Sequence, residues 1–230
     1  MVTITWLGHT SFSFQLETGE VILADPWIEG NPKFPESYTI DRVDTILITH
    51  GHFDHVGGVR KLAAQFEPQI FANYEICTWL GRKGVANCNG MNKGGRARTP
   101  GGLDVTMTHA LHSSGITEDD GSMAYGGEAA GYILHFPDGR NAYFAGDTDV
   151  FSEMQFLREF YTPALAFLPI GDLFTMSPRG AAAACRMLSC PEVIPMHYGT
   201  FPPLTGTPAE LAELVSSTVT VLTPGVPYRW

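Results

Sequence analysis

The chain has 230 residues, of which 44% are hydrophobic and 17% are charged, a balance that excludes disorder along the whole chain. Its formal net charge is −10, which argues against a protein that grips nucleic acid through phosphates. No apolar run approaches the roughly 18 residues of a membrane span, and the first residues lack the features of a signal peptide. We therefore expect a globular, cytoplasmic protein without a membrane or nucleic-acid partner.

The four cysteines are scattered along the chain and have no CxxC spacing: Cys77, Cys88, Cys185 and Cys190. This pattern is typical of free thiols in a reducing compartment. It predicts neither a disulfide framework nor a thiolate metal site.

The first third of the chain alternates short apolar runs with turns, and then acquires helical periodicity. The pattern predicts strands at residues 2–7, 11–16, 21–24, 45–49 and 69–72, and helices at residues 56–66 and 74–81. The strand at 45–49 is rich in β-branched residues and ends directly at His50. It is therefore typical of a buried strand that leads into a site.

Residues 84–102 form a Gly-rich stretch that is too long for a simple connection, so we expect a functional or mobile loop. No Asp or Glu lies between Ile76 and Leu103, yet five basic residues do: Arg82, Lys83, Lys93, Arg96 and Arg98. In a chain with a net charge of −10, this basic stretch is the main indication that the substrate is anionic. We expect Lys93 and Arg96 to meet an anionic substrate such as a phosphate. Solvated charge or an oligomer contact is the alternative.

The second half predicts strands at 103–108, 131–136 and 141–145, the last two joined by a turn at Pro137-Asp138-Gly139. Residues 112–130 form a second candidate lid. Strands at 165–169, 193–196 and 219–222 then alternate with helices at 181–188 and 209–215. Because no linker or repeat divides the chain, we predict one mixed, layered α/β domain spanning 1–230.

Three histidines and one aspartate fall within six residues, in His50-Gly51-His52-Phe53-Asp54-His55. These are ligands that divalent metals prefer, and the pattern should arise by chance on the order of once in a few thousand such chains. If the segment is extended, His50 and His52 project to one side and can share an ion. Asp54 and His55 follow as the chain turns into a helix, where they can reach a second ion.

Six residues cannot complete two coordination spheres, so other strand ends should supply the remaining ligands. Three polar residues stand just past predicted strands: His112, Asp147 and His197. We expect them to meet the first cluster at one edge of the sheets.

These motifs resemble the metallo-β-lactamase superfamily, whose pattern is H-x-H-x-D-H followed by a His, an Asp and a His in this order. WLGHTSF, LADPW, ALHSSG, GEAAGY and FTMSP further resemble a branch that includes ascorbate-6-phosphate lactonase and metal-dependent hydrolases. The resemblance covers nearly the whole chain. It implies a four-layer αββα sandwich, with two mixed β-sheets flanked by helices and the site at the edge between the sheets.

The same resemblance implies which residues hold which ion. His50, His52 and His112 would bind the first metal, Asp54, His55 and His197 the second, and Asp147 would bridge both. No ligand position is missing. His52 stands where diiron redox relatives have a carboxylate, so the resemblance disfavours oxygen handling or electron transfer.

Two such ions would activate a bridging hydroxide, so we expect a hydrolase with Asp54, Asp147 and His197 as its catalytic candidates. Asp25 and His9 are candidates for orienting the ligands from behind. Metal-bound water, His9 and Tyr198 are candidates for the leaving-group acid, and Tyr198 is also a candidate substrate contact.

The leading hypothesis is therefore hydrolysis of a small, anionic metabolite, either a lactone or a phosphodiester. Zinc is the first choice for both ions, with manganese or iron as alternatives. An RNA-processing nuclease and a non-catalytic metal-binding regulator are the competing functions. The two long loops, with aromatic residues such as Trp27 and Trp230, could join copies of the chain, which leaves a homo-oligomer open.

Overall fold

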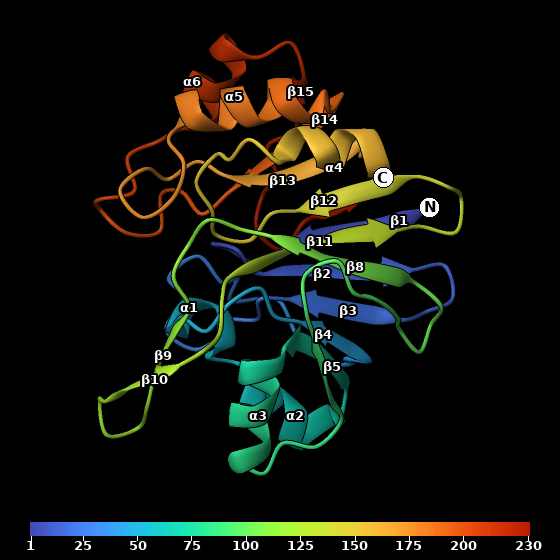
Figure 1. Ribbon diagram of the computed structural model, residues 1–230, viewed down its shortest axis with the longest axis vertical. Helices are drawn as coiled ribbons and strands as arrows, with labels where there is room; N and C mark the ends of the chain where they lie inside the picture. The colour runs from blue at the N-terminus through green and yellow to red at the C-terminus, as the bar shows by residue number, and fades with distance from the viewer.

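Two seven-stranded sheets lie face to face in the structure, a computed structural model that describes residues 1–230 (Figure 1). The first sheet has the order β16 (Pro227–Arg229), β1 (Val2–Trp6), β2 (Phe12–Leu16), β3 (Val21–Ala24), β4 (Thr45–Leu47), β5 (Gln69–Asn73) and β6 (Cys88–Met91). The second has the order β15 (Thr218–Val219), β14 (Glu192–Met196), β13 (Leu165–Pro169), β12 (Asn141–Phe144), β11 (Ala130–His135), β8 (Asp104–His109) and β7 (Arg96–Arg98).

Helices cover the outer faces of this pair of sheets (Figure 1). The first sheet carries α2 (Val59–Phe66) and α3 (Tyr74–Arg82), and the second carries α4 (Met154–Tyr161), α5 (Pro178–Leu188) and α6 (Pro208–Leu214). A short helix, α1 (Phe53–Val56), lies at one edge, from which a small hairpin of β9 (Gly115–Thr117) and β10 (Met123–Tyr125) projects. The predicted αββα sandwich is confirmed.

The two sheets repeat one pattern of strand directions. β1, β2 and β3 are antiparallel, and β3 to β6 are parallel. In the second sheet β7, β8, β11 and β12 are antiparallel, and β12 to β15 are parallel. Both sheets are therefore mixed, and their parallel strands end at the edge that carries α1 and the long loops, opposite the two termini (Figure 1).

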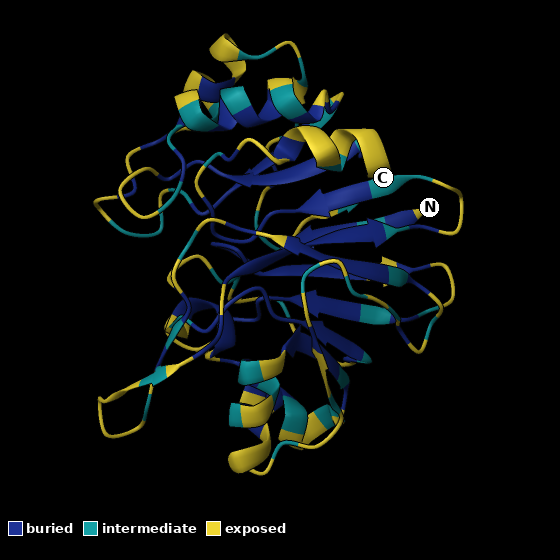
Figure 2. Cartoon of the chain, viewed as in Figure 1, coloured by how far each residue is buried: buried dark blue, intermediate teal, exposed yellow.

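Alternation of side chains along the strands divides the interior into two layers. Between the sheets, Phe14 meets Phe144 and Phe167 with ring centroids 6.3 and 5.5 Å apart. On β4, Leu47 joins this inner core, whereas its neighbour Ile46 belongs to the cluster beneath α2 and α3. Figure 2 shows that the central strands of both sheets are buried, with exposed residues concentrated in loops, in the projecting hairpin and on outer helix faces.

The elements differ from the sequence prediction in several places, among them the hairpin β9–β10 inside the predicted lid 112–130 and the strand β16, neither of which was predicted. Residues 84–102 are not one loop, because β6 and β7 form the edge strands of the two sheets there. The predicted helix 56–66 begins only at Val59, as α2, because Gly57 and Gly58 separate it from the short helix α1 that precedes it. The helix α4 was not predicted. The predicted turn at 137–139 is confirmed between β11 and β12, closed by the hydrogen bond from Phe136 N to Arg140 O.

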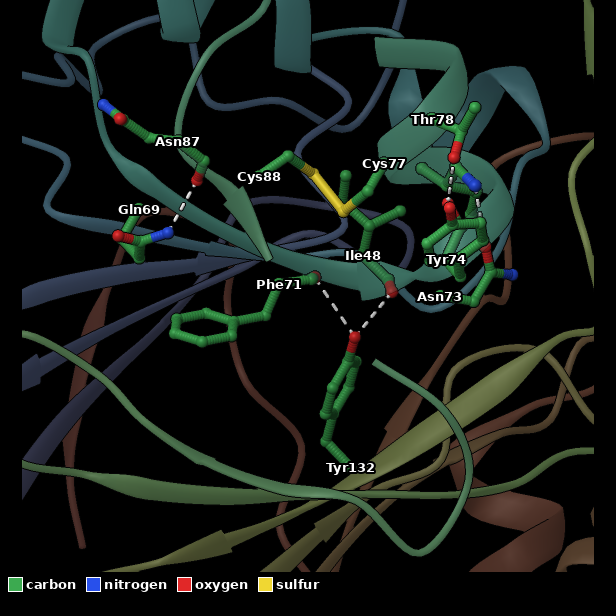
Figure 3. Close-up of a disulfide and its surroundings, with 11 residues drawn as sticks. Ile48, Gln69, Phe71, Asn73, Tyr74, Cys77, Thr78, Asn87, Cys88 and Tyr132 are labelled. Carbon is green, nitrogen blue, oxygen red and sulfur yellow. Dashed lines mark hydrogen bonds between the residues drawn. A yellow bond between two sulfur atoms is a disulfide. The ribbon is translucent and has the colours of Figure 1, made fainter. Parts of the chain in front are cut away.

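The expectation of four free thiols is wrong. Cys77 on α3 and Cys88 on β6 form a disulfide, with their Cα atoms 5.4 Å apart, inside the usual range for such bonds (Figure 3). The pair forms because α3 packs across the edge strand that follows it. Cys185 and Cys190 are free and buried. The cysteines therefore no longer argue for a reducing compartment.

No helix combines the length and the apolar composition that crossing a membrane requires. The longest, α5, has 11 residues.

Candidate metal centre

Six chemically active side chains follow the carboxyl ends of strands that run in the same direction. Three follow strands of the first sheet and three follow strands of the second, in the order His9, Asp25, His50, His112, Asp147 and His197. Because those ends meet at one edge of the sandwich, residues from both sheets converge there.

The first group of donor atoms consists of three imidazole nitrogens. His50 Nε2 lies 2.8 Å from His52 Nδ1, which lies 3.3 Å from His112 Nε2. A tetrahedral zinc with bonds of about 2.0–2.1 Å places its ligands about 3.3 Å apart. The three nitrogens therefore have the spacing of ligands around one ion.

The second group combines imidazoles with carboxylates. His55 Nε2 lies 3.8 Å from Asp54 Oδ2, and His197 Nε2 lies 3.9 Å from the same oxygen. Asp147 Oδ2 lies 3.0 Å from His197 Nε2 and 3.4 Å from His55 Nε2, and it is also 3.7 Å from His112 Nε2 of the first group. Asp147 therefore stands between the two groups.

Several of these atoms are buried and lack a hydrogen-bond partner in the protein. His55 Nε2, Asp147 Oδ1 and His197 Nδ1 are all in this state. An unpaired buried polar group costs free energy, and clustered imidazoles with carboxylates suit a first-row divalent ion. The residues present therefore fit a metal centre, in which an ion would satisfy His55 Nε2 and Asp147 Oδ1.

Asp25 orients two of the histidines, one by a direct hydrogen bond and the other through Thr49. Its Oδ2 accepts hydrogen bonds from His55 Nδ1 at 2.8 Å and from Thr49 Oγ1 at 2.6 Å. The Thr49 hydroxyl oxygen can in turn accept from His50 Nδ1, 3.1 Å away. Both imidazoles are thereby set with Nδ1 protonated and Nε2 free to bind an ion.

His9 contacts the second group through Asp54. Its Nε2 lies 2.9 Å from Asp54 Oδ2, its Nδ1 lies 2.9 Å from Thr200 Oγ1, and its ring packs on His197 with centroids 4.0 Å apart. The side chain is fully buried. It can therefore orient Asp54, but burial and these contacts keep it from serving as a proton donor to a leaving group.

Charges at the site follow from burial and from the neighbouring groups. Burial holds the pKa of His50 well below its usual value, so its imidazole is neutral at neutral pH. Burial alone would lower the pKa of His55, but Asp147, Asp25 and Asp54 raise it well above the usual value. Burial alone would raise the pKa of Asp54, but His55 and the hydrogen bond from His9 lower it to about 2, so it is a carboxylate.

Three site residues have left-handed backbones, which non-glycine residues seldom adopt: His9 (φ 56°), Asp25 (φ 45°) and His197 (φ 55°). Gly146, just before Asp147, has φ 62°, and a Cβ there would lie 2.7 Å from Thr49. Such strain tends to be stored at functional sites, where the surrounding fold enforces it.

The donors open into a pocket of about 460 Å³. Its lining consists of His52, Phe53, Asp54, His112, Ser113, Asp147, Phe174, His197 and Phe201. Five of these residues are predicted ligands. The other two, His50 and His55, are buried next to them, so all seven predicted ligands lie together.

Three predicted substrate contacts lie elsewhere. Lys93 is ion-paired with Glu128 at 2.6 Å, and Arg96 is paired with Asp104 at 2.7 Å on the exposed edge strand β7. Tyr198 stacks on Trp6 with centroids 5.4 Å apart, and burial raises its pKa to about 12. None of the three lines the pocket. The basic residues from which an anionic substrate was predicted therefore do not face the donor atoms.

Trp27 is also not an interface residue, because it is buried against Phe53 and Phe201. The sequence reasoning missed Thr49, Ser113 and the three phenylalanines of the pocket. Thr49 directly precedes His50 and Ser113 directly follows His112, and these positions were the available signals. The three phenylalanines stand singly in separate segments, so they give no periodic pattern that would have indicated them.

Comparison with known proteins agrees with this geometry. A family model described as a beta-lactamase superfamily domain matches residues 20–198. A UPF0173 metal-dependent hydrolase of Solibacter usitatus is 56% identical over 99% of both chains, and one of Koribacter versatilis is 49% identical over 92% of this chain and 91% of its own. The solved structure of Igni18, a metallo hydrolase of Ignicoccus hospitalis, is 35% identical with a TM-score of 0.85, covering 100% of this chain and 99% of that one.

A sandwich of two mixed sheets with histidines and aspartates gathered at one edge defines a metal-dependent hydrolase of the metallo-β-lactamase superfamily. Within that superfamily, the chain belongs to the UPF0173 metal-dependent hydrolases.

Proposed function

We propose that the chain binds two divalent metal ions and uses them to hydrolyse a small molecule. The position of Asp147 carries this proposal, because its Oδ2 lies within 3.7 Å of a histidine from each donor group. Seven donor residues are more than one ion of ordinary coordination number needs. His50, His52 and His112 would hold one ion, Asp54, His55 and His197 the other, and Asp147 both.

Ions bound there would supply hydroxide at neutral pH and polarise the bond to be broken. In the hydrolysis, the hydroxyl of water joins the acyl carbon or phosphorus, the bond to the leaving oxygen breaks, and that oxygen takes up a proton. Asp54 is a carboxylate of low pKa and cannot supply the proton, although it can accept one hydrogen bond from the nucleophile. Tyr198 lies outside the pocket, so we assign the proton to solvent water.

The remaining residues keep the donors aligned. Asp25 and Thr49 fix the tautomers of His50 and His55, and His9 fixes Asp54. Ser113 Oγ lies 3.3 Å from His52 Nε2 and can accept its proton, which leaves Nδ1 for the ion. We propose zinc as the metal, because imidazole and carboxylate together suit it.

Metal analysis of protein purified without chelator tests the dinuclear centre. We expect two ions per chain, at most one in His52→Ala, and two in the control His109→Ala. His109 is a matched control because it lies outside the pocket, with its ring against Phe151. One ion or none in the unaltered protein, even after reconstitution, would refute the proposal.

A panel of lactones, simple esters and phosphodiesters then tests the reaction. We expect turnover of at least one carbonyl substrate, lost in His52→Ala and retained in His109→Ala. Cleavage of structured RNA with a steep salt dependence would instead favour a nuclease. Two bound ions without turnover of any substrate class would favour a non-catalytic role.

A further inference from the structure

Aromatic rings, rather than charged groups, surround the opening of the metal pocket. Phe53 is 56% exposed and Phe174 is 55% exposed, although both line the pocket. Phe201 completes the wall, and Trp27 supports it from below, with its centroid 5.6 Å from that of Phe53 and 5.8 Å from that of Phe201. The three phenylalanines thus form a supported apolar surface beside the donor atoms.

The backbone places Phe174 there at an energetic cost. Its two predecessors are left-handed, with φ 67° at Asp172 and 46° at Leu173. The turn is held against the loop that follows β12, because Asp172 N donates to Met176 O and Met176 N donates to Thr148 O. Two consecutive residues in this conformation cost free energy. Such backbone strain clusters at active sites and ligand-binding segments, so it supports a functional position for Phe174.

The lining has no positive side chain of its own. None of its nine residues is Lys or Arg, and the two basic residues that the sequence suggested as substrate contacts, Lys93 and Arg96, are paired with Glu128 and Asp104. A carboxylate or phosphate held against the three phenyl rings, away from the donor groups, would lose water without gaining a partner. The wall therefore selects against a charge on the part of the substrate that packs against it.

We propose that the substrate is an uncharged ester or lactone with a flat apolar group that packs against Phe53, Phe174 and Phe201. This inference rests on the proposed hydrolase function and names its substrate class. Water cleaves the acyl carbon–oxygen bond, giving a carboxylic acid and an alcohol. The apolar group lies on the phenylalanine wall while the carbonyl faces the donor groups.

Binding of three hydroxamic acids to the metal-loaded protein tests this independently of turnover. Acetohydroxamic, benzohydroxamic and 4-carboxybenzohydroxamic acid share one metal-binding group, so differences between them report on the wall. By calorimetry we expect benzohydroxamic acid (the benzo compound) to bind about tenfold or more tightly than acetohydroxamic acid (the aceto compound). The reason is that its phenyl group moves from water onto the phenylalanine wall. The carboxylated compound should bind more weakly than the benzo compound.

Phe174→Ala and Phe201→Ala should each reduce the benzo-to-aceto ratio to about threefold or less, because each removes part of the apolar wall. Phe156→Ala, an exposed phenylalanine on α4 outside the pocket, is the matched control and should leave the ratio unchanged. Two bound ions in every variant show that the centre itself is intact.

The outcomes separate the two proposals. Equal binding of the aceto and benzo compounds, or tighter binding of the carboxylated one, with two ions bound, overturns the apolar substrate and leaves the hydrolase. Fewer than two ions in the unaltered protein overturns the dinuclear hydrolase, and the substrate inference falls with it.

Discussion

Oδ2 of Asp25 lies 2.8 Å from Nδ1 of His55, and both side chains are completely buried. The same carboxylate also accepts hydrogen bonds from the backbone nitrogen and the hydroxyl of Thr49. One buried aspartate thus determines the orientation of imidazoles that belong to both donor groups.

Asp25→Asn should weaken metal binding about 10–100-fold, as is usual for partners of ligating histidines. The amide cannot accept from all three donors at once, because one of its two polar atoms is itself a donor. Competition with a chelating dye measures the affinity. Asp138→Asn, at an exposed turn, is the control and should bind metal normally. Unchanged affinity in Asp25→Asn would show that the carboxylate is not needed to orient the ligands.

Metal loading should stabilise the protein more as pH rises. In the metal-free protein the carboxylates raise the pKa of His55 well above 6.5, although burial opposes them. Its contribution to folding stability is therefore fully present below the unfolded pKa of about 6.5 and is lost as pH rises through the folded pKa. An ion needs the deprotonated Nε2, so binding displaces this proton.

We expect the gain in unfolding free energy on loading to be larger at about pH 8.5 than at about pH 6.5. Urea denaturation of loaded and stripped protein measures it, with proton release on loading as a second readout. A gain that does not change with pH would contradict a protonated His55.

Tyr132→Phe should lower the unfolding free energy by about 1–3 kcal/mol. Its buried hydroxyl contacts the carbonyl oxygens of Ile48, at 2.9 Å, and Phe71, at 3.1 Å, and so links the second sheet to the end of β4 (Figure 3). Removing it leaves the Ile48 carbonyl without that donor. Tyr143→Phe is the matched control, because the buried Tyr143 hydroxyl bonds no backbone carbonyl and has only the Thr108 side chain as a polar neighbour. Equal losses in the two variants would disprove a specific role for the Tyr132 contact.

Reduction of the Cys77–Cys88 disulfide should lower the unfolding free energy by about 2–3 kcal/mol, because it closes a short loop in the unfolded chain. The ions should stay bound, since α3 carries no ligand. Cys77→Ser with Cys88→Ser should behave like the reduced protein and be insensitive to dithiothreitol. Thiol titration of the denatured, unreduced protein should find two free thiols, and four would contradict the bond.

The sequence predicts which donor residues meet at the candidate metal centre, because their signal is chemical and local. Four donors lie within six residues, and His112, Asp147 and His197 each follow a strand that alternation or apolar composition reveals. The order of these motifs then points to a known fold. Strand ends and ligand positions can therefore both be inferred from the order of the amino acids.

The substrate contacts could not be predicted in the same way. Lys93 and Arg96 form a basic run in the sequence, but their acidic partners, Glu128 and Asp104, come from later segments. The positive charges that cluster along the chain are thus neutralised by acidic residues that lie beside them in the folded protein. Tyr198 directly follows a ligand, yet its side chain turns toward Trp6 and away from the pocket. The apolar wall is built from three separate segments whose approach depends on the complete fold.

The donors are also divided between the two sheets. His50 to His55 extend from β4 of the first sheet, whereas His112, Asp147 and His197 extend from β8, β12 and β14 of the second. Each half of the chain carries an incomplete set, so complete metal sites could form only after the halves have docked. Ions bound there would link the two sheets at this edge. Metal binding during folding would then report that the two halves have joined in the correct register, and chelation would separate the sheets first at this edge.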